Sequence, residues 1–70
     1  MQFEAGNVYR HKNFKDVKVF VKTVVNTVWH DNAFHMEVIW LTNSGTAMAV
    51  DKIKVYLTDL EKWSRVDGDA

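Results

Sequence analysis

The segment from Val17 to His30 restricts the fold of this chain more than any other part of its sequence. It is dominated by Val and Thr, whose branched Cβ atoms favour extended backbone over helix. Val, Thr and Trp occupy every odd position of the segment, so one face of a strand would be continuously apolar or β-branched. We therefore predict one long β-strand here, and with it an all-β domain.

A strand of this length needs a partner, and the residues that follow it predict a hairpin. Asp31-Asn32 supplies two residues that tolerate left-handed backbone angles, as a two-residue hairpin turn requires. The returning strand would run from Ala33 to Thr42. This turn sets a register that places Trp29 opposite Phe34, Val25 opposite Val38 and Thr23 opposite Trp40. We assign both tryptophans to the core, because a domain this small must obtain its burial from large side chains.

Shorter elements are expected on both sides of the hairpin. Before it we predict a strand from Val8 to His11 and a polar loop from Lys12 to Asp16. After it, Asn43-Ser44-Gly45 marks a turn in which Gly45 takes a positive φ, and Thr46 to Val50 forms another strand.

The C-terminal third is less uniform. Asp51 to Leu57 fits both a strand, by its alternation, and a helix, by the spacing of its apolar residues. Thr58-Asp59-Leu60-Glu61 has the form of a capping box, which predicts a short helical turn ending near Trp63. A last short strand from Ser64 to Val66 would follow. The fold class is therefore all-β, a small curled barrel of about five strands with one helical turn before the last strand.

This order of elements resembles the SH3-like barrel. More narrowly, three stretches look like a group of short bacterial and phage domains of unknown function: Gly6-Asn7-Val8-Tyr9-Arg10-His11, Val38-Ile39-Trp40 and Trp63-Ser64-Arg65-Val66. The resemblance implies an SH3-like fold and a phage or bacterial accessory setting. It implies no mechanism, since the group has no settled activity.

Length and composition describe one small domain. The 70 residues fit a single unit, residues 1–70, with residues 1–4 and 67–70 expected to be frayed. The chain has no Cys, so disulfides and thiolate metal sites are excluded, and we take the cytoplasm as the default compartment. Neither a secretory signal nor an apolar run of membrane-spanning length is found, so no membrane association is expected.

Catalysis is not expected. Ser44 and Ser64 lack the surroundings of an activated nucleophile, and the carboxylates Asp59 and Glu61 are explained by a helix first turn. His30, Asp31 and His35 lie close in sequence and could hold a metal, but a tight site needs three or four ligands, and His11 is the only other histidine. We therefore predict no catalytic residues, no metal and no cofactor.

Binding is the remaining class of function, and two surfaces could carry it. Four apolar residues fall on the nominally outer face of the hairpin, where they are either covered by the chain's own curvature or used as an interface: Phe20, Val24, Ile39 and Leu41. We predict a non-enzymatic interaction module that docks onto a protein partner or onto itself through this patch.

The alternative is a nucleic-acid-binding barrel. The formal net charge is zero, but one stretch is strongly basic, with five cations: Arg10, Lys12, Lys15, Lys18 and Lys22. Phe20 shares a strand face with two of the lysines, and cations interleaved with an aromatic ring can bind a phosphate backbone while stacking a base. Against this, exposed strands often carry lysines to discourage edge pairing.

Overall fold

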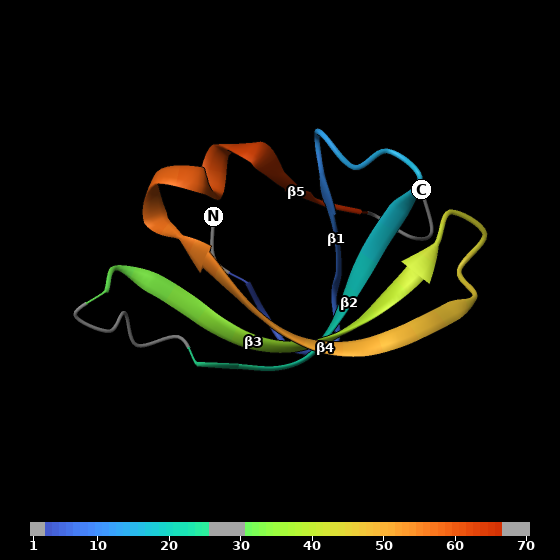
Figure 1. Ribbon diagram of the computed structural model, residues 1–70, viewed down its shortest axis with the longest axis horizontal. Helices are drawn as coiled ribbons and strands as arrows, with labels where there is room; N and C mark the ends of the chain where they lie inside the picture. Colours follow the sequence, from blue (N-terminus) through green and yellow to red (C-terminus); the bar gives the residue numbers. More distant parts are fainter. Residues whose placement is uncertain (1–2, 26–30, 67–70) are drawn as a thin grey trace.

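The computed structural model describes residues 3–25 and 31–66. Its elements follow in the order β1 (Val8–His11), β2 (Val17–Val25), β3 (Ala33–Thr42), β4 (Ala47–Tyr56), η1 (Leu57–Lys62) and β5 (Trp63–Arg65). The five strands form one antiparallel sheet in the order β4-β3-β2-β1-β5. The sheet curls, so that η1 and β5 lie across from β3 and β4 (Figure 1). The predicted all-β fold, with a short helical turn before the last strand, is confirmed.

The core fills the concave side of this sheet. It consists of residues at most 4% exposed: Phe3, Tyr9, Val19, Val21, Phe34, Met36, Val38 and Val55. Phe3 lies in the segment expected to be frayed, yet it is fully buried. Its ring makes edge contacts with Tyr9 at 4.7 Å, Trp63 at 5.6 Å and Phe34 at 6.2 Å between centroids. The N-terminal segment is therefore part of the core, and the expectation of fraying is wrong at this residue.

The register of the long hairpin differs from the prediction. Val25 pairs with His35 rather than with Val38, and Thr23 pairs with Glu37 rather than with Trp40. The register predicted from a tight turn at Asp31-Asn32 is therefore wrong. Asn32 does adopt a left-handed φ of 57°, as its residue type allows. Trp29, with its predicted partner contact, lies outside the described residues.

Packing explains why this register is adopted. Val19 and Val21 lie opposite Trp40 and Val38, which brings three fully buried valines together on the concave side. The turn-based register would place Val21 opposite Thr42 instead, which exchanges an apolar neighbour for a polar one. Because a register shift moves whole rows of side chains, burial of the valines outweighs the local preference of two turn residues.

A bulge changes the facing of β2 beyond Val21. The register shifts by one residue between Val21 and Thr23, with Lys22 between them. Past this point Val24 pairs with Met36 and packs against the core, so the even position that pointed outward in the first half of β2 points inward in the second. The two-sided apolar pattern of the sequence comes partly from this change.

The ambiguous segment from Asp51 to Leu57 is mostly strand. β4 runs from Ala47 to Tyr56 and pairs with β3, with one bulge between Ala47 and Ala49, and Ile53 and Val55 reach the core side. The 3-10 helix η1 then begins at Leu57. Its N-cap is Tyr56, with no side-chain cap bond, so the capping box predicted from Thr58 is wrong.

The turn after β3 and the last strand differ little from their predictions. Gly45 has a φ of 94°, as the turn after β3 requires. The last strand begins at Trp63, earlier than predicted. Trp40 packs against the core but is only half-buried, and its Nε1–H donates to Asp51 Oδ2 at 3.2 Å. Across residues 3–25 and 31–66, the helix found falls far short of the length and apolarity that crossing a bilayer would take.

Candidate functional site

The convex face of strands β2, β3 and β4 carries a row of apolar side chains that the core does not use. Side chains alternate across a strand, so the neighbours of buried Val19, Val21 and Val38 point away from the core. Phe20 pairs with Ile39, and Ile39 pairs with Val50 of β4. These three residues form one line across three strands on the solvent side.

Leu41 extends this line into a patch. It lies two residues beyond Ile39 on β3, opposite Lys18 of β2 and Ala47 of β4. We call Phe20, Ile39, Leu41 and Val50 the outer patch. Val50 is 59% exposed, whereas the other three are half-buried by one another and by neighbouring side chains. A contiguous apolar surface of this kind marks an interaction site more often than scattered apolar residues do.

Of the four residues predicted for this surface, three lie together. Phe20, Ile39 and Leu41 are cross-strand or same-strand neighbours, whereas the bulge turns Val24 to the core side. Val50 was missed, because the sequence placed it at the end of a strand whose partner and facing were unknown. Its alternation with Asp51 and Lys52 gave no indication of which face it occupied.

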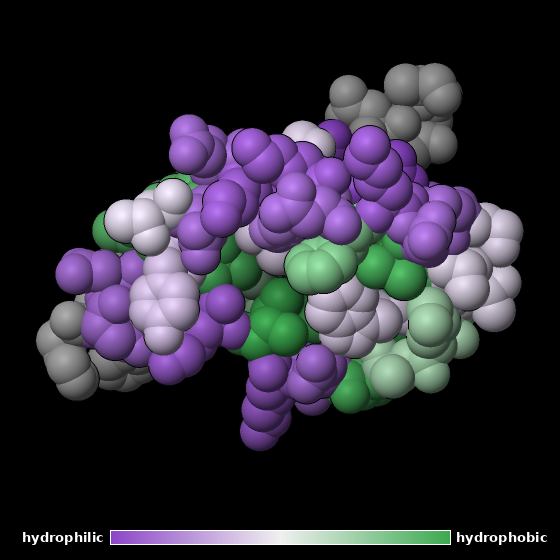
Figure 2. Space-filling model, turned by 45° about the horizontal axis from the view of Figure 1, so that its top comes forward, coloured by the Kyte–Doolittle hydropathy of each residue, from purple (hydrophilic) through white to green (hydrophobic). Residues whose placement is uncertain are grey.

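Edge strand β4 is the second notable feature of this side of the molecule. It pairs with β3 on one edge and, in the part of the chain that the structure describes, with no strand on the other. Its first four residues, Ala47 to Val50, include no charged residue, and Met48 and Val50 are 57% and 59% exposed. Figure 2 turns this convex face away from the viewer, and the apolar side chains in the middle of that view, bordered above by hydrophilic ones, lie on the other side of the molecule.

The far end of the convex face is charged. His35 Nε2 lies 3.1 Å from Asp31 Oδ2, and because a carboxylate can only accept, Nε2 carries the proton. Lys54 Nζ is 4.0 Å from the same oxygen and 5.5 Å from the centroid of the Tyr56 ring. Partial desolvation alone would raise the pKa of Asp31, but the hydrogen bond and charge of His35, with Lys54, hold it below its ordinary value.

A shallow, open groove of about 600 Å³ lies beside these charges. It is lined by Thr23, Val25, His35, Met36, Glu37, Lys52, Ile53 and Lys54. Its mixed lining shows no set of converging groups of the kind that fixes a small ligand.

The histidine cluster is only partly testable. Asp31 and His35 do come together, in a hydrogen bond in which the histidine is the donor. His30, the third residue considered, lies outside the described residues. Over residues 3–25 and 31–66, no group of three or more His, Cys, Asp or Glu side chains lies close enough to hold a metal ion.

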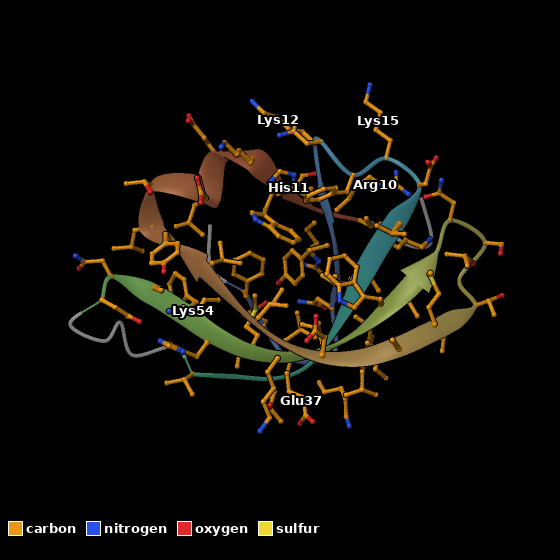
Figure 3. All side chains as sticks on the ribbon, viewed as in Figure 1. Arg10, His11, Lys12, Lys15, Glu37 and Lys54 are labelled. Atoms are coloured by element: carbon orange, nitrogen blue, oxygen red, sulfur yellow. The ribbon has the colours of Figure 1, made fainter. Side chains whose placement is uncertain are left out.

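The five predicted nucleic-acid-binding cations do not form one stripe. Lys12 and Lys15 are exposed on the loop after β1 and point away from the body of the molecule (Figure 3). Arg10 instead donates from Nη2 to Asn43 Oδ1 at 3.0 Å, which ties it to the turn after β3. Lys18 lies opposite Leu41, and Lys22 is exposed in the bulge of β2.

The loop that carries Lys12 and Lys15 is held by His11. The Asn13 N–H donates to His11 Nδ1 at 3.0 Å, and the His11 ring lies 4.8 Å from Phe14 and 5.0 Å from Trp63 between centroids. Burial lowers the pKa of His11, and the nearby charges of Lys62 and Lys12 lower it further, against a smaller opposing effect of Asp59. The loop therefore depends on a neutral histidine.

With this geometry in place, the chain was compared with models of protein families, with curated proteins and with solved structures, and none of the three comparisons found a match. The function is therefore argued from the residues of this chain alone.

Proposed function

We propose that this domain is a non-enzymatic interaction module that docks onto a protein partner or onto another copy of itself. One observation carries the proposal: Phe20, Ile39 and Val50 line up across three strands on the face turned away from the core. The sheet already buries its concave side, so this second apolar row contributes little to the domain's own core. Covering such side chains releases about 25 cal/mol for each Å² of apolar surface removed from water.

Further support comes from the surroundings of the patch. Lys18, which pairs with Leu41, borders the outer patch at one end. Glu37 of β3 and Lys52 of β4, which pair with each other, border it at the other end. An apolar centre within a charged rim is the usual anatomy of a protein–protein interface. Charged rims also limit non-specific association, because a partner must match them.

A capture experiment with a matched pair of variants tests this proposal. Ile39→Lys places a charge at the centre of the outer patch, and Glu37→Gln changes the same face of the same strand outside the patch. Tagged wild-type and variant domains are incubated with lysate of the source cells, after melting curves have shown that each is folded. We expect Ile39→Lys to reduce capture of the partner at least tenfold, since loss of a central contact costs about 1.4 kcal/mol or more.

The control sets the outcome that would contradict the proposal. Glu37→Gln should capture the partner as well as the wild type does. Equal capture by all three proteins, with Ile39→Lys folded, would show that the patch takes no part in docking.

The second candidate is nucleic-acid binding, and one observation favours it. Lys12 and Lys15 extend into solvent on either side of Phe14, which is 53% exposed. The same capture experiment at two salt concentrations discriminates between the candidates. Capture that carries nucleic acid, survives Ile39→Lys and falls steeply with salt would support this surface instead.

We also propose that the fold is an SH3-like barrel. The support is the order of elements, in which a 3-10 turn precedes a last strand that returns to β1. A phage or bacterial accessory role rests on the resemblance of the three short stretches described above. Placement in the cytoplasm rests on the cysteine-free composition.

A further inference from the structure

We propose that two copies of this chain pair through the free edges of their β4 strands, in antiparallel register about Val50. The inference rests on the proposed function, which it deepens by naming the partner as a second copy. Pairing of this kind would join two five-stranded sheets into one continuous sheet.

The two edge strands of the sheet, β4 and β5, differ in length and therefore in their capacity to pair with another strand. β5 has only three residues, and short edge strands are poor templates for another chain. β4 has ten residues, and four of them, Ala47 to Val50, follow one another without a charge or a proline. A long edge strand that begins with four uncharged residues is of the kind that recruits another strand.

The charges of β4 select the register. In antiparallel pairing about a two-fold axis, the central residue lies opposite the same residue of the other copy. Every other pair of opposite residues points its side chains to the same face of the sheet. A pairing centred on Asp51 or Lys52 would place two copies of the same charged residue directly opposite one another. A pairing centred on Ile53 would place Lys52 of each copy opposite Lys54 of the other. Like charges directly opposite are destabilising.

Centring on Val50 avoids these oppositions. Val50 would face Val50 of the other copy, and Ala49 would face Asp51. The bulge of β4 lies between Ala47 and Ala49, so a centre at Met48 or Ala49 would fall on the irregular part of the strand, whereas Val50 lies just outside it. Val50 is also 59% exposed, which gives the pairing an apolar contact at its centre.

The two-fold axis would also combine the outer patches. An axis perpendicular to the sheet keeps both convex faces on one side, so the row Phe20, Ile39 and Val50 of one copy would continue into that of the other. Pairing along this one edge would bury less surface than the roughly 1,600 Å² of a standard interface. The dimer is therefore expected to be weak and to depend on concentration.

Cysteine trapping tests the register directly, because the wild-type chain has no Cys. In Val50→Cys the two thiols would belong to directly opposite residues, whose Cα atoms are about 4.5–5.5 Å apart in antiparallel pairs, within disulfide range. The matched control is Lys52→Cys, on the same strand and the same face. Its two copies would be about 13 Å apart along the strand, beyond disulfide reach.

Under a mild oxidant at high protein concentration, we expect Val50→Cys to form a covalent dimer of twice 8.1 kDa at least tenfold faster than Lys52→Cys. In sedimentation runs, Val50→Lys should remain monomeric at concentrations where the wild type associates. Equal rates for the two cysteine variants, or a wild type that stays monomeric throughout, would overturn strand pairing. Capture that still depends on Ile39 would then leave the proposed function standing, with another protein as the partner.

Discussion

Phe3 stands at a position that no periodicity of the sequence assigns to the core. Its ring nevertheless touches Tyr9, Phe34 and Trp63, residues from three different strands. The Tyr9 hydroxyl also accepts a hydrogen bond from the Glu4 N–H at 2.8 Å. This bond holds the N-terminal segment next to the buried Tyr9 ring. The short segment before the strand predicted from Val8 is not long enough to carry a pattern that would reveal this contact.

Truncation of Phe3 tests its part in the core. Phe3→Ala should lower the free energy of unfolding by about 3 kcal/mol or more, a large share of the stability of so small a domain. Urea denaturation measures the loss, with Phe14→Ala as the control. Phe14 is 53% exposed, so its truncation should change stability by less than about 1 kcal/mol. Losses of similar size in both variants would place Phe3 outside the core.

His11 gives the domain a pH dependence whose sign can be worked out. Its pKa is lowered in the folded state, whereas in the unfolded chain it is close to the ordinary value of about 6.5. Below that pH the unfolded chain therefore binds more protons than the folded one. The contribution of His11 to stability is complete above about pH 6.5 and is lost progressively as the pH falls below it.

The His11→Asn variant isolates this contribution. The asparagine side-chain oxygen can accept the Asn13 N–H in place of Nδ1, and asparagine does not titrate. The loss of stability between pH 7.5 and pH 5 should therefore be smaller in the variant than in the wild type. Urea denaturation at both pH values measures it, and equal losses would show that His11 is not responsible.

At the scale of elements, local turn chemistry and side-chain packing gave different registers for the β2–β3 hairpin. Asn32 has the left-handed backbone predicted for it, but the strands pair according to the burial of Val19, Val21 and Val38. Strand identity and fold class could be predicted, because alternation is a property of each segment. Register could not, because it depends on which two faces meet.

The same reasoning explains which part of the candidate site was predictable. Phe20, Ile39 and Leu41 keep the facing that their spacing indicates, because no irregularity lies between each of them and the buried valines. Val24 lies beyond the bulge at Lys22, and a one-residue bulge reverses the facing of everything that follows it. Val50 became visible only when β4 was seen to continue through Asp51 and to pair with β3.

For the molecule as a whole, one curled sheet separates the two apolar surfaces of the sequence. The concave side closes over Phe3, Tyr9 and the valines, with η1 and β5 lying across from β3 and β4. The convex side of β2, β3 and β4 keeps the outer patch, next to the edge of β4 that pairs with no strand among the described residues. A protein partner or a second copy docked on the outer patch, as proposed, would therefore leave the core undisturbed.

The alignment of Phe20, Ile39 and Val50 is the claim on which this account depends, and nuclear Overhauser contacts in solution test it most directly. The account predicts contacts from the Ile39 methyl groups to the Phe20 ring and to the Val50 methyl groups. Contacts from Ile39 to Val24 instead, with Val25 beside Val38, would contradict it, because the hairpin would then follow the tight-turn register and the outer patch would not exist.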